Sequence, residues 1–351
     1  MQIFNIMNPD WQQFLTQQGA AIDAGVVQHF GDAAAELLST RQGTVLCDLS
    51  QFGTLRAAGE DAQSFLQNML SNDTREVDAG RAQLSSLNTP KGRMLATMLI
   101  WRDGNDYLLQ LPRALCEPLR KKLSMYVLRA KVKITDASDE IVVLGVAGEN
   151  AQEILQKQFG ELPQQPFGFA AAGQAGVLKF SDTRFQVSVA AQHAPALWTA
   201  LAQHAQPVGS ACWDWLNIRA GIPVILPQTQ EQFVPQMANL EVLGGVNFKK
   251  GCYPGQEIVA RMQYLGKAKR RMYLAHLASR AAPQPGDELF SADMEGQACG
   301  MIANAAPAPG GGYDLLAVVQ IASREAQTVH WKSPQGEALQ FLPSPYPLPQ
   351  D

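Results

Sequence analysis

The chain has 351 residues, of which 46% are hydrophobic and 17% are charged, which is enough apolar material for two or three domains with cores of their own. A formal net charge of −4 and a sequence pI near 5.8 exclude a protein whose whole surface follows nucleic acid, while leaving room for a local basic patch. The first residues, MQIFNIMNPDWQQFL, predict no signal peptide, and the sequence has no run of about 18 apolar residues that would span a membrane.

Cysteine usage indicates a reducing, cytoplasmic environment. The five cysteines lie at least 40 residues apart, form no C-x-x-C pair and have no histidine within a few positions, which argues against a disulfide framework or a zinc site. They are Cys47, Cys116, Cys212, Cys252 and Cys299. We therefore expect free thiols and no metal site built by this chain alone.

A ten-residue pattern occurs twice. AGEDAQSFLQ at 58–67 and AGENAQEILQ at 147–156 agree at seven of ten positions. Each copy follows a strand-like apolar run and carries acidic or amide residues suited to a helix start, followed by apolar residues at helical spacing. The pattern predicts a strand–turn–helix unit used twice, as in a duplicated α+β architecture, although two unrelated helix starts with similar capping residues would look alike.

The segments around the two copies predict further elements in chain order. Residues 94–111, MLATMLIWRDGNDYLLQL, are two apolar runs around an Asp-Gly turn, which predicts a β-hairpin. A helix is expected over 113–130 and a strand over 131–135, and after the second copy a strand over 184–190 and a helix over 194–204. A linker at 278–290 precedes short strand-like runs, which predict a small antiparallel barrel, and the proline-rich tail is expected to be extended.

The segment 249–261, KKGCYPGQEIVAR, places a thiol in basic surroundings. Residues 253–256 carry proline and glycine at the two central positions of a type II turn, and QEIVARM predicts a helix directly after it. Cys252 is then expected in the loop before a helix N-terminus, where nearby cations and the helix dipole both favour thiolate. We interpret Cys252 as the reactive cysteine and the other four as small buried packing residues.

Charge is concentrated around this thiol. Residues 249–271 contain seven Lys or Arg and one Glu, a local net charge of +6, so the remaining chain carries −10. Such a patch is expected to attract a polycarboxylate tail, a phosphate or an RNA backbone. The alternative interpretation, above all for KAKRR at 267–271, is a solvated surface without a ligand.

The motif KKGCYPGQE resembles the K-G-C-Y-x-G-Q-E signature of the YgfZ family, folate-binding relatives of the glycine-cleavage aminomethyltransferase. Three earlier segments resemble the family in the expected order: NTPKGRML at 88–95, WLNIRAGIP at 215–223 and QFVPQMANLEVLGG at 232–245. The similarity covers about residues 40 to 345.

This resemblance implies an α+β fold with duplicated strand–helix halves, in a three-domain ring around a central folate pocket. The expected domains are 1–145, an aminomethyltransferase-like folate-binding domain, 146–278, a second α+β domain with the cysteine motif, and 279–345, a C-terminal antiparallel β-barrel. Residues 346–351 are expected to be a flexible tail.

The resemblance also implies a function: an accessory protein for iron–sulfur cluster assembly or repair, which supports iron–sulfur enzymes including one that modifies tRNA. Cys252 would act as the reactive thiolate, and tetrahydrofolate or a derivative would be the cofactor. The motif residues in support are Lys249, Lys250, Gly251, Tyr253, Gly255, Gln256, Glu257 and Arg261. One cysteine cannot hold a four-thiolate cluster, so any iron–sulfur cluster would be transient and shared with a partner.

Folate contacts are carried over by motif position. Phe52 and Trp213 would stack on the pterin, and Lys91 and Arg93 would hold the carboxylates of the folate tail. Relatives often carry Glu where this chain has Arg219, which can only donate hydrogen bonds. Gln236, Asn239 or Asp214 would then accept from the pterin.

Two other functions compete with this interpretation. A folate-dependent one-carbon transferase or demethylase would need a general acid or base, for which Asp48 and Asp214 are available but not marked by any motif. Direct binding of tRNA through KAKRR would depend steeply on salt, but aromatic residues are sparse there.

Overall fold

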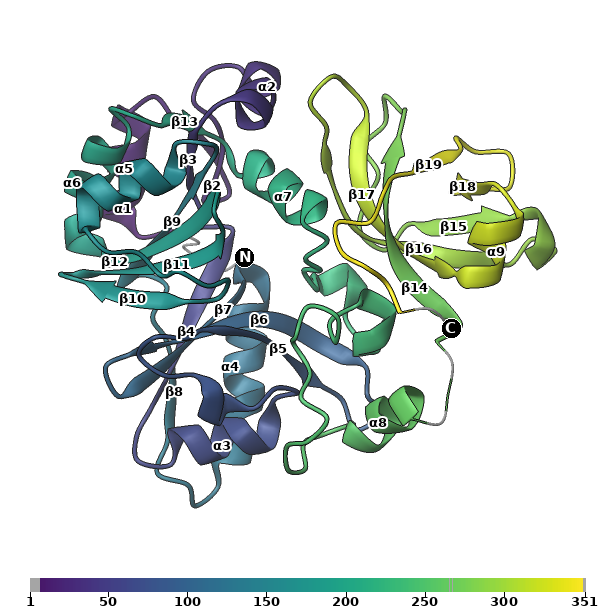
Figure 1. Ribbon diagram of the computed structural model, residues 1–351, viewed down its shortest axis with the longest axis horizontal. Helices are drawn as coiled ribbons and strands as arrows, with labels where there is room; N and C mark the ends of the chain where they lie inside the picture. Colours follow the sequence, from purple (N-terminus) through teal and green to yellow (C-terminus); the bar gives the residue numbers. More distant parts are fainter. Residues whose placement is uncertain (1–6, 265, 267, 350–351) are drawn as a thin grey trace. The chain divides into compact units, whose positions relative to one another are not determined.

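The computed structural model describes residues 7–264, 266 and 268–349, and the chain forms two compact units that are interleaved in the sequence (Figure 1). Unit 1 contains the residues up to Phe65, Arg75–Gln83 and Leu99–Trp213. Unit 2 contains Leu66–Thr74, Leu84–Met98 and the residues from Asp214 onward. The boundaries fall inside five elements, which are α3 (Ala62–Met69), η1 (Thr74–Glu76), β5 (Gln83–Asn88), β6 (Met94–Asp103) and α7 (Ser210–Arg219).

Unit 1 contains a six-stranded sheet in the order β10-β11-β12-β9-β3-β13. Its strands are β3 (Val45–Asp48), β9 (Ile141–Ala147), β10 (Phe169–Ala172), β11 (Ala175–Ser181), β12 (Arg184–Ala190) and β13 (Gln206–Val208). Neighbours are antiparallel except β3 and β13, which are parallel. The strand predicted over 184–190 is thus confirmed as β12.

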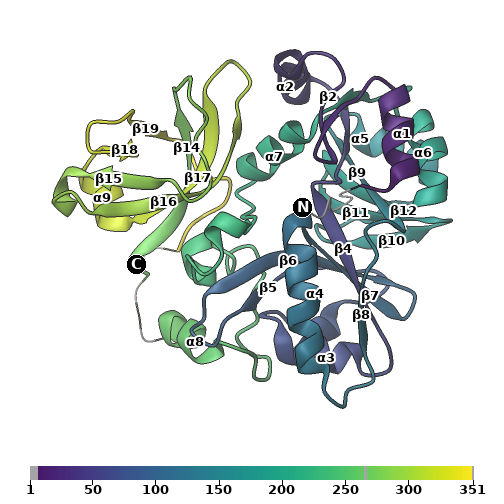
Figure 2. The same cartoon turned by 180° about the vertical axis from the view of Figure 1, so that it is seen from behind.

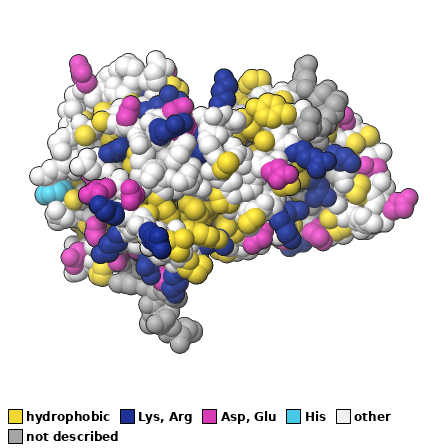
Figure 3. All heavy atoms as spheres, turned by 90° about the horizontal axis from the view of Figure 1, so that it is seen from below, with side chains coloured by type: hydrophobic (Ala, Val, Ile, Leu, Met, Phe, Trp, Pro, Cys, Tyr) yellow, Lys and Arg dark blue, Asp and Glu magenta, His cyan; other side chains and the backbone are white. Residues whose placement is uncertain are grey.

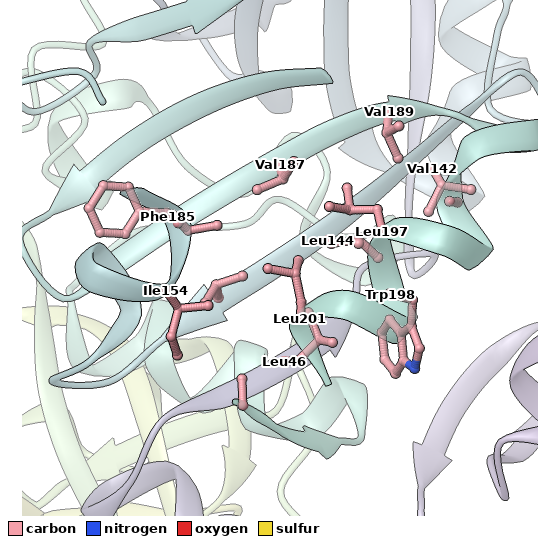
Figure 4. Close-up of a cluster of buried hydrophobic side chains, with 14 of the residues drawn as sticks. Leu46, Val142, Leu144, Ile154, Phe185, Val187, Val189, Leu197, Trp198 and Leu201 are labelled. Carbon is pink, nitrogen blue, oxygen red and sulfur yellow. The ribbon is translucent and has the colours of Figure 1, made fainter. Parts of the chain in front are cut away.

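One face of this sheet packs on three helices, α1 (Pro9–Gln17), α5 (Ala151–Phe159) and α6 (Ala194–Leu201). Strand residues such as Leu144 and Val187, both fully buried, interleave with helix residues such as Leu201 and Trp198 in one hydrophobic cluster (Figure 4). Successive side chains along each strand point to opposite faces of the sheet, so the apolar ones gather on one face. Burial of that face against the three helices positions the sheet.

The duplicated pattern forms the predicted strand–turn–helix unit in both copies. In the first, β4 (Phe52–Ala58) leads into α3, and in the second β9 leads into α5. Gly59 and Gly148 occupy the same place in the turn, with φ of +125° and +127°. Each of their carbonyls accepts a hydrogen bond at 3.1 Å from a backbone N–H three residues later, that of Ala62 or Ala151. The sequence agreement therefore reflects one local conformation used twice, since φ in this region favours glycine.

A second sheet has the order β5-β6-β7-β4-β8, with β7 (Asp106–Pro112) and β8 (Lys133–Asp136). The predicted hairpin is confirmed, because β6 and β7 pair up to Asp103 and Asp106, and Gly104 between them has φ of +58°. The predicted helix over 113–130 is α4 (Arg113–Val127). Smaller elements of unit 1 are β1 (Ala21–Asp23), β2 (Val26–His29), α2 (Ala33–Gln42), and the short helices η1 (Thr74–Glu76), which starts in unit 2, and η2 (Ala191–His193).

Unit 2 contains the predicted C-terminal antiparallel barrel, a six-stranded sheet in the order β18-β15-β16-β17-β14-β19 (Figure 2). Its strands are β14 (Arg270–Leu277), β15 (Glu288–Ser291), β16 (Ala298–Pro307), β17 (Tyr313–Gln320), β18 (Val329–Trp331) and β19 (Leu339–Phe341). A bridge between His330 and Ala338 links the two ends of the sheet, so the barrel is nearly closed. Its core is aliphatic, with Leu289, Ile302 and Leu315 fully buried.

The remaining elements of unit 2 connect to this barrel. They are η3 (Pro227–Thr229), η4 (Pro235–Ala238), α8 (Gln256–Tyr264), η5 (Ala292–Met294) and α9 (Ile321–Ala326). Residues 342–349 form no helix or strand, but the hydroxyl of Tyr346 donates to Gly221 O at 2.8 Å, and burial raises the pKa of Tyr346 to about 12. Tyr346 is therefore anchored, which corrects the expectation of a flexible tail for this residue.

No helix in the part of the chain that the structure describes is both long and apolar enough to cross a membrane.

Candidate functional site around Cys252

Cys252 lies in the loop before α8, as predicted, and directly precedes a tight turn of residues 253–256. Gly255 has φ of +81°, the value of the third residue of a type II turn, and Gln256 N donates to Tyr253 O at 3.1 Å to close it. The Gln256 side chain donates back to Lys250 O at 3.2 Å. Cys252 is exposed, and an ideal Cβ on Gly251 would meet no heavy atom within 4 Å. The thiol is thus presented to solvent directly before a hydrogen-bonded turn.

The early K-G-R segment contacts this turn. An ideal Cβ on Gly255 would lie 2.5 Å from Thr89 O and 2.5 Å from Gly92 Cα, and one on Gly92 would lie 3.0 Å from Ile258 Cβ. Two glycines far apart in the sequence therefore permit close backbone contact, which no other residue would allow. This contact joins the two motifs within unit 2.

Lys250 is a buried residue and not a surface cation. It is 5% exposed, and its Nζ donates to Gln67 O at 2.6 Å, to Leu70 O at 2.6 Å and to Asn72 O at 2.8 Å. These carbonyls lie at and just beyond the C-terminal end of α3, where backbone acceptors lack helical partners and the dipole favours a cation. The structure thus gives this ammonium a role in holding the loop to α3, a correction to the expectation that Lys250 chiefly serves the thiol.

Tyr253 packs beside the same ammonium. It is 6% exposed, Lys250 Nζ lies 5.2 Å from its ring centroid, and burial raises its phenol pKa to about 12. Lys249, Glu257 and Arg261 remain exposed. Lys250 and Tyr253 therefore anchor the turn, whereas Lys249, Glu257 and Arg261 face solvent.

A buried polar network that sequence reasoning missed holds the segment leading into the motif. Asn72 Nδ2 donates to Gly244 O at 2.7 Å and to Leu84 O at 2.8 Å, and Ser71 Oγ donates to Gly245 O at 2.7 Å. Ser86 N donates to Ser71 Oγ at 2.8 Å. The signal that could have revealed it is the polar run SND at 71–73 directly after a predicted amphipathic helix, facing the two glycines of 232–245.

The expected folate-tail cations differ in their surroundings. Lys91 is exposed, whereas the Arg93 guanidinium donates to Glu231 O at 3.1 Å and to Gln232 O at 2.8 Å. Arg93 therefore joins the K-G-R segment to the loop before η4 while remaining exposed.

Gln236 and Asn239 are buried and used within unit 2. Gln236 Nε2 donates to Val259 O at 2.7 Å, and its Oε1 is buried without a hydrogen-bond partner among the described residues. Asn239 has φ of +56° and donates from Nδ2 to Met272 O at 2.8 Å. An asparagine suits this left-handed position, so Asn239 has a structural role, whereas Gln236 retains a buried acceptor.

Part of the predicted basic patch is internal. Arg271 is 7% exposed, forms a buried ion pair with Glu241 and donates to Gln236 O at 3.0 Å. Burial raises the pKa of the Glu241 carboxyl, an effect that Arg271 opposes. Lys267 of KAKRR lies outside the described residues. Because Lys250 and Arg271 are buried, residues 249–271 present less positive charge to solvent than the predicted net charge of +6.

Arg219, the departure from the usual Glu, lies beside Asp314 of the barrel. Its Nη1 is 3.5 Å from Asp314 Oδ2, which also accepts from Trp215 Nε1 at 2.9 Å, and His276 Nδ1 lies 2.9 Å from Asp314 Oδ1. Three side chains thus converge on one buried carboxylate and fix the later part of α7 to β14 and β17. A glutamate at 219 would place two carboxylates together, so Arg219 is explained by its local partner.

The two predicted stacking residues lie in unit 1. Trp213 is 2% exposed, the Arg184 guanidinium lies 4.3 Å from its ring centroid, and an ideal Cβ on Gly145 would lie 2.5 Å from the ring. Trp213 is therefore packed on both sides, and its pterin contact stays a prediction. Phe52 is half-buried at the start of β4 and lines a cavity of only about 10 Å³.

The transferase alternative named Asp48 and Asp214 as available acids or bases. Asp214 is half-buried on α7, and Asp48 is fully buried in unit 1. Asp48 accepts hydrogen bonds from Trp11 Nε1 at 2.8 Å and from Ser50 Oγ at 2.9 Å, and burial raises its pKa. These partners hold it as a structural carboxylate. A pocket of about 840 Å³ in unit 1 is lined by Arg56, Trp101 and Phe169 among others, and by none of the predicted site residues.

The other four cysteines are buried, as predicted. Burial raises the pKa of the Cys116 thiol to about 12. No group of three His, Cys, Asp or Glu side chains among the residues described is arranged to hold a metal ion.

Comparison with known proteins defines the class first. Residues 12–250, more than half of the chain, match the GCVT N-terminal domain. The glycine cleavage system aminomethyltransferase T from Bartonella henselae has a similar structure, with a TM-score of 0.79, 18% sequence identity and 96% of each chain covered. The fold is thus that of the aminomethyltransferase class.

Curated relatives then narrow the class to a family. The tRNA-modifying protein YgfZ of Enterobacter sp. (strain 638) is 33% identical over 313 residues, which is 88% of this chain and 95% of the relative. That of Shigella boydii serotype 4 (strain Sb227) is 34% identical over 253 residues, or 72% and 77% of the two chains. The chain belongs to the YgfZ family, as the motif predicted.

Proposed function

We propose that this protein is a cytoplasmic, tetrahydrofolate-binding accessory factor that supports iron–sulfur enzymes, including ones that modify tRNA, through the thiol of Cys252. The name of the curated relatives, tRNA-modifying protein YgfZ, and the aminomethyltransferase fold support a folate-related accessory role in tRNA modification. The observation that carries the finer proposal is the exposed thiol directly before a hydrogen-bonded turn.

Cys252 is accessible to a partner while the other four thiols are buried. The open space at Gly251 permits close approach, and the contact between Gly92 and Gly255 holds the turn in place. One thiolate cannot hold a four-thiolate cluster. A transient cluster or sulfur atom would therefore be shared with a client protein, an assembly protein or a small thiol.

Two buried polar atoms of unit 2 would pair with tetrahydrofolate. Gln236 Oε1 is an acceptor, and Asn88 Nδ2 a donor, that lack hydrogen-bond partners among the described residues. Such atoms are costly to bury unless a ligand or water pairs with them, and a pterin edge offers both donors and an acceptor. Both residues border the Cys252 segment, since Thr89 follows Asn88 and contacts Gly255, and Gln236 donates to α8. Lys91 and Arg93 would hold the tail carboxylates.

The test of the thiol is Cys252→Ser. The variant should lose the ability to restore modified tRNA nucleosides in a bacterium deleted for its own YgfZ, measured by mass spectrometry of bulk tRNA, while tetrahydrofolate affinity changes less than about twofold. Its thermal unfolding should match wild type because the residue is exposed. Equal loss of both functions would assign Cys252 a structural role.

The test of the cofactor is a titration with tetrahydrofolate followed by tryptophan fluorescence. Gln236→Leu removes the buried acceptor and should weaken binding about tenfold, the value of a hydrogen bond near 1.4 kcal/mol, whereas Lys249→Gln should not. Absence of binding by the wild-type protein would remove the folate part of the proposal and leave the thiol part standing.

A further inference from the structure

The end of α4 carries exposed hydrophobic side chains on the surface of unit 1. Met125 is 68% exposed, Tyr126 48% and Leu128 88%. Six large hydrophobic side chains are exposed in the described part of the chain, and three of them lie within residues 125–128. A concentration of this kind marks an interaction surface more often than scattered single residues do.

The backbone holds Leu128 in this exposed position. Leu128 follows the last residue of α4 with φ of +47°, a conformation that is rare for a bulky side chain. On the inner side of the helix, Leu119 and Leu123 are buried against unit 1. The inner face of the helix is thus packed through Leu119 and Leu123, and Met125, Tyr126 and Leu128 do not contribute to that packing.

Unpaired cations surround these hydrophobic side chains. Residues 120–133 contain six Lys or Arg and no Asp or Glu. Arg120 and Lys121 lie 2.7 Å and 3.2 Å from Glu117, and Lys131 lies 2.8 Å from Glu60. The other three cations, Lys122, Arg129 and Lys133, have no ion-pair partner among the described residues.

Two of the unpaired cations lie next to the hydrophobic residues. Lys122 is three and four residues before Met125 and Tyr126, so it shares their side of the helix. Arg129 directly follows Leu128. On the part of unit 1 seen in Figure 3, Lys and Arg side chains (dark blue) lie beside hydrophobic ones (yellow), with Asp and Glu side chains (magenta) among them. We call Lys122, Met125, Tyr126, Leu128 and Arg129 the α4-end patch.

We propose that the α4-end patch binds an acidic, amphipathic segment of a partner protein, with leucine-like side chains on Met125, Tyr126 and Leu128 and carboxylates on Lys122 and Arg129. Met, Tyr and Arg are residue types enriched in protein interfaces. Charge complementarity selects the acidic partner, because Lys122, Arg129 and the nearby Lys133 have no ion-pair partner among the described residues. The nearby carboxylates, Glu60 and Glu117, lie outside the patch and pair with Lys131, Arg120 and Lys121.

RNA and anionic lipid fit the patch less well. RNA binding by sequence-tolerant surfaces uses several stacking rings and many phosphate contacts, and this patch has one ring and two cations. Met125 and Leu128 would gain nothing against a phosphate backbone. An anionic lipid surface would meet Glu60 and Glu117, which are 77% and 35% exposed beside the same segment.

The experiment measures binding of a fluorescein-labelled synthetic helix with leucine on one face and glutamate on the other, by fluorescence anisotropy with the full-length protein. The matched probe has lysine in place of every glutamate. Bulk tRNA and vesicles of phosphatidylcholine with phosphatidylglycerol are tested in parallel. We expect the glutamate peptide to bind at least about tenfold more tightly than the lysine peptide, with an affinity that falls as salt rises.

The variants separate the two contributions. Leu128→Ser with Met125→Ser should weaken glutamate-peptide binding about tenfold or more, because two apolar contacts with the leucine face of the peptide are lost. Arg129→Glu should weaken it about fivefold and flatten its salt dependence. The controls are Leu38→Ser, 42% exposed on α2, and Arg280→Glu, exposed in unit 2, and neither should change binding.

Three results would overturn the proposal. These are equal binding of the two peptides, patch variants that bind as wild type does, and tRNA or vesicle binding that is lost in the patch variants while peptide binding is not. Cys252→Ser should bind the peptide normally, so failure of this proposal and failure of the proposed function are distinguishable.

Discussion

Two segments of this protein carry the same linear charge and use it in opposite ways. Residues 249–271, around Cys252, and residues 120–133, at the end of α4, each have a net charge of +6. In the first, Lys250 and Arg271 are 5% and 7% exposed and bind backbone carbonyls or Glu241. In the second, Arg129 is exposed and has no ion-pair partner among the described residues.

The difference shows that charge along a sequence does not measure charge on a surface. A cation is buried where backbone carbonyls or a carboxylate repay the loss of hydration. The carbonyls at the end of α3 do this for Lys250. In the part of the chain that the structure describes, no equivalent acceptors bind Lys122 or Arg129. The basic segment around Cys252, which was predicted to be a ligand patch, is thus partly structural. At the end of α4, Lys122, Arg129 and Lys133 have no ion-pair partner among the described residues, while the other three cations pair with Glu60 or Glu117.

The largest effect is expected from removing the buried cation Lys250. Lys250→Met should lower the free energy of unfolding by about 4 kcal/mol, because three carbonyls lose a charged donor and each unpaired buried group costs about 1–3 kcal/mol. Chemical denaturation at neutral pH measures it. Lys249→Met, one residue earlier and exposed, should change stability by less than about 0.5 kcal/mol. Similar small effects in both would mean that Lys250 is hydrated in solution.

A smaller effect, with a pH signature, is expected for Arg271→Gln. Burial raises the pKa of Glu241 above its usual 4.5, so the folded state holds the proton more tightly than the unfolded state. Stability is therefore lost as pH rises from about 4.5 through the folded-state pKa. Without Arg271 that pKa rises further, so the destabilisation should grow from about 1 kcal/mol near pH 4 to about 3 kcal/mol near pH 7.

The control for this prediction is the double variant Arg271→Gln with Glu241→Gln, which has no charge to titrate at this site. Its unfolding free energy should depend less on pH than that of the single variant. A destabilisation that stays constant between pH 4 and 7 would show that Glu241 is not the titrating partner.

The smallest effect is expected from removing the exposed cation Arg129. Arg129→Gln should change the free energy of unfolding by less than about 0.5 kcal/mol, since an exposed cation without an ion-pair partner contributes little. Thermal unfolding measures it, alongside the peptide affinity described above. A loss of more than about 1 kcal/mol would reveal a structural partner for Arg129 and weaken the case for a free patch.

Local patterns predicted much of the fold. Gly59 and Gly148, in matching positions of the repeat, have nearly the same φ, and the Asp-Gly hairpin and the Pro254-Gly255 turn form where the sequence placed them. These features depend on φ preferences and hydrogen bonds within a few residues. The same holds for the exposed position of Cys252, which follows from the turn that precedes α8.

The roles of Lys250, Arg219 and Trp213 could not be predicted, because each depends on a partner far away in the chain. Lys250 binds carbonyls about 180 residues earlier, and Arg219 lies beside Asp314. Motif membership identified these residues without distinguishing anchoring from ligand binding. A motif identifies a residue, whereas the role of that residue depends on a distant partner that only folding brings into contact.

The amino-acid sequence alone determined the duplicated strand–helix units, the strands of the terminal barrel and the turn before α8, since short-range backbone preferences and hydrophobic periodicity dictate them. Its motifs identified the family by resemblance. Tertiary structure alone decided which charges are buried, because burial depends on whether distant acceptors converge on a cation closely enough to replace its water. That condition is met at Lys250 and Arg271 and absent at the end of α4.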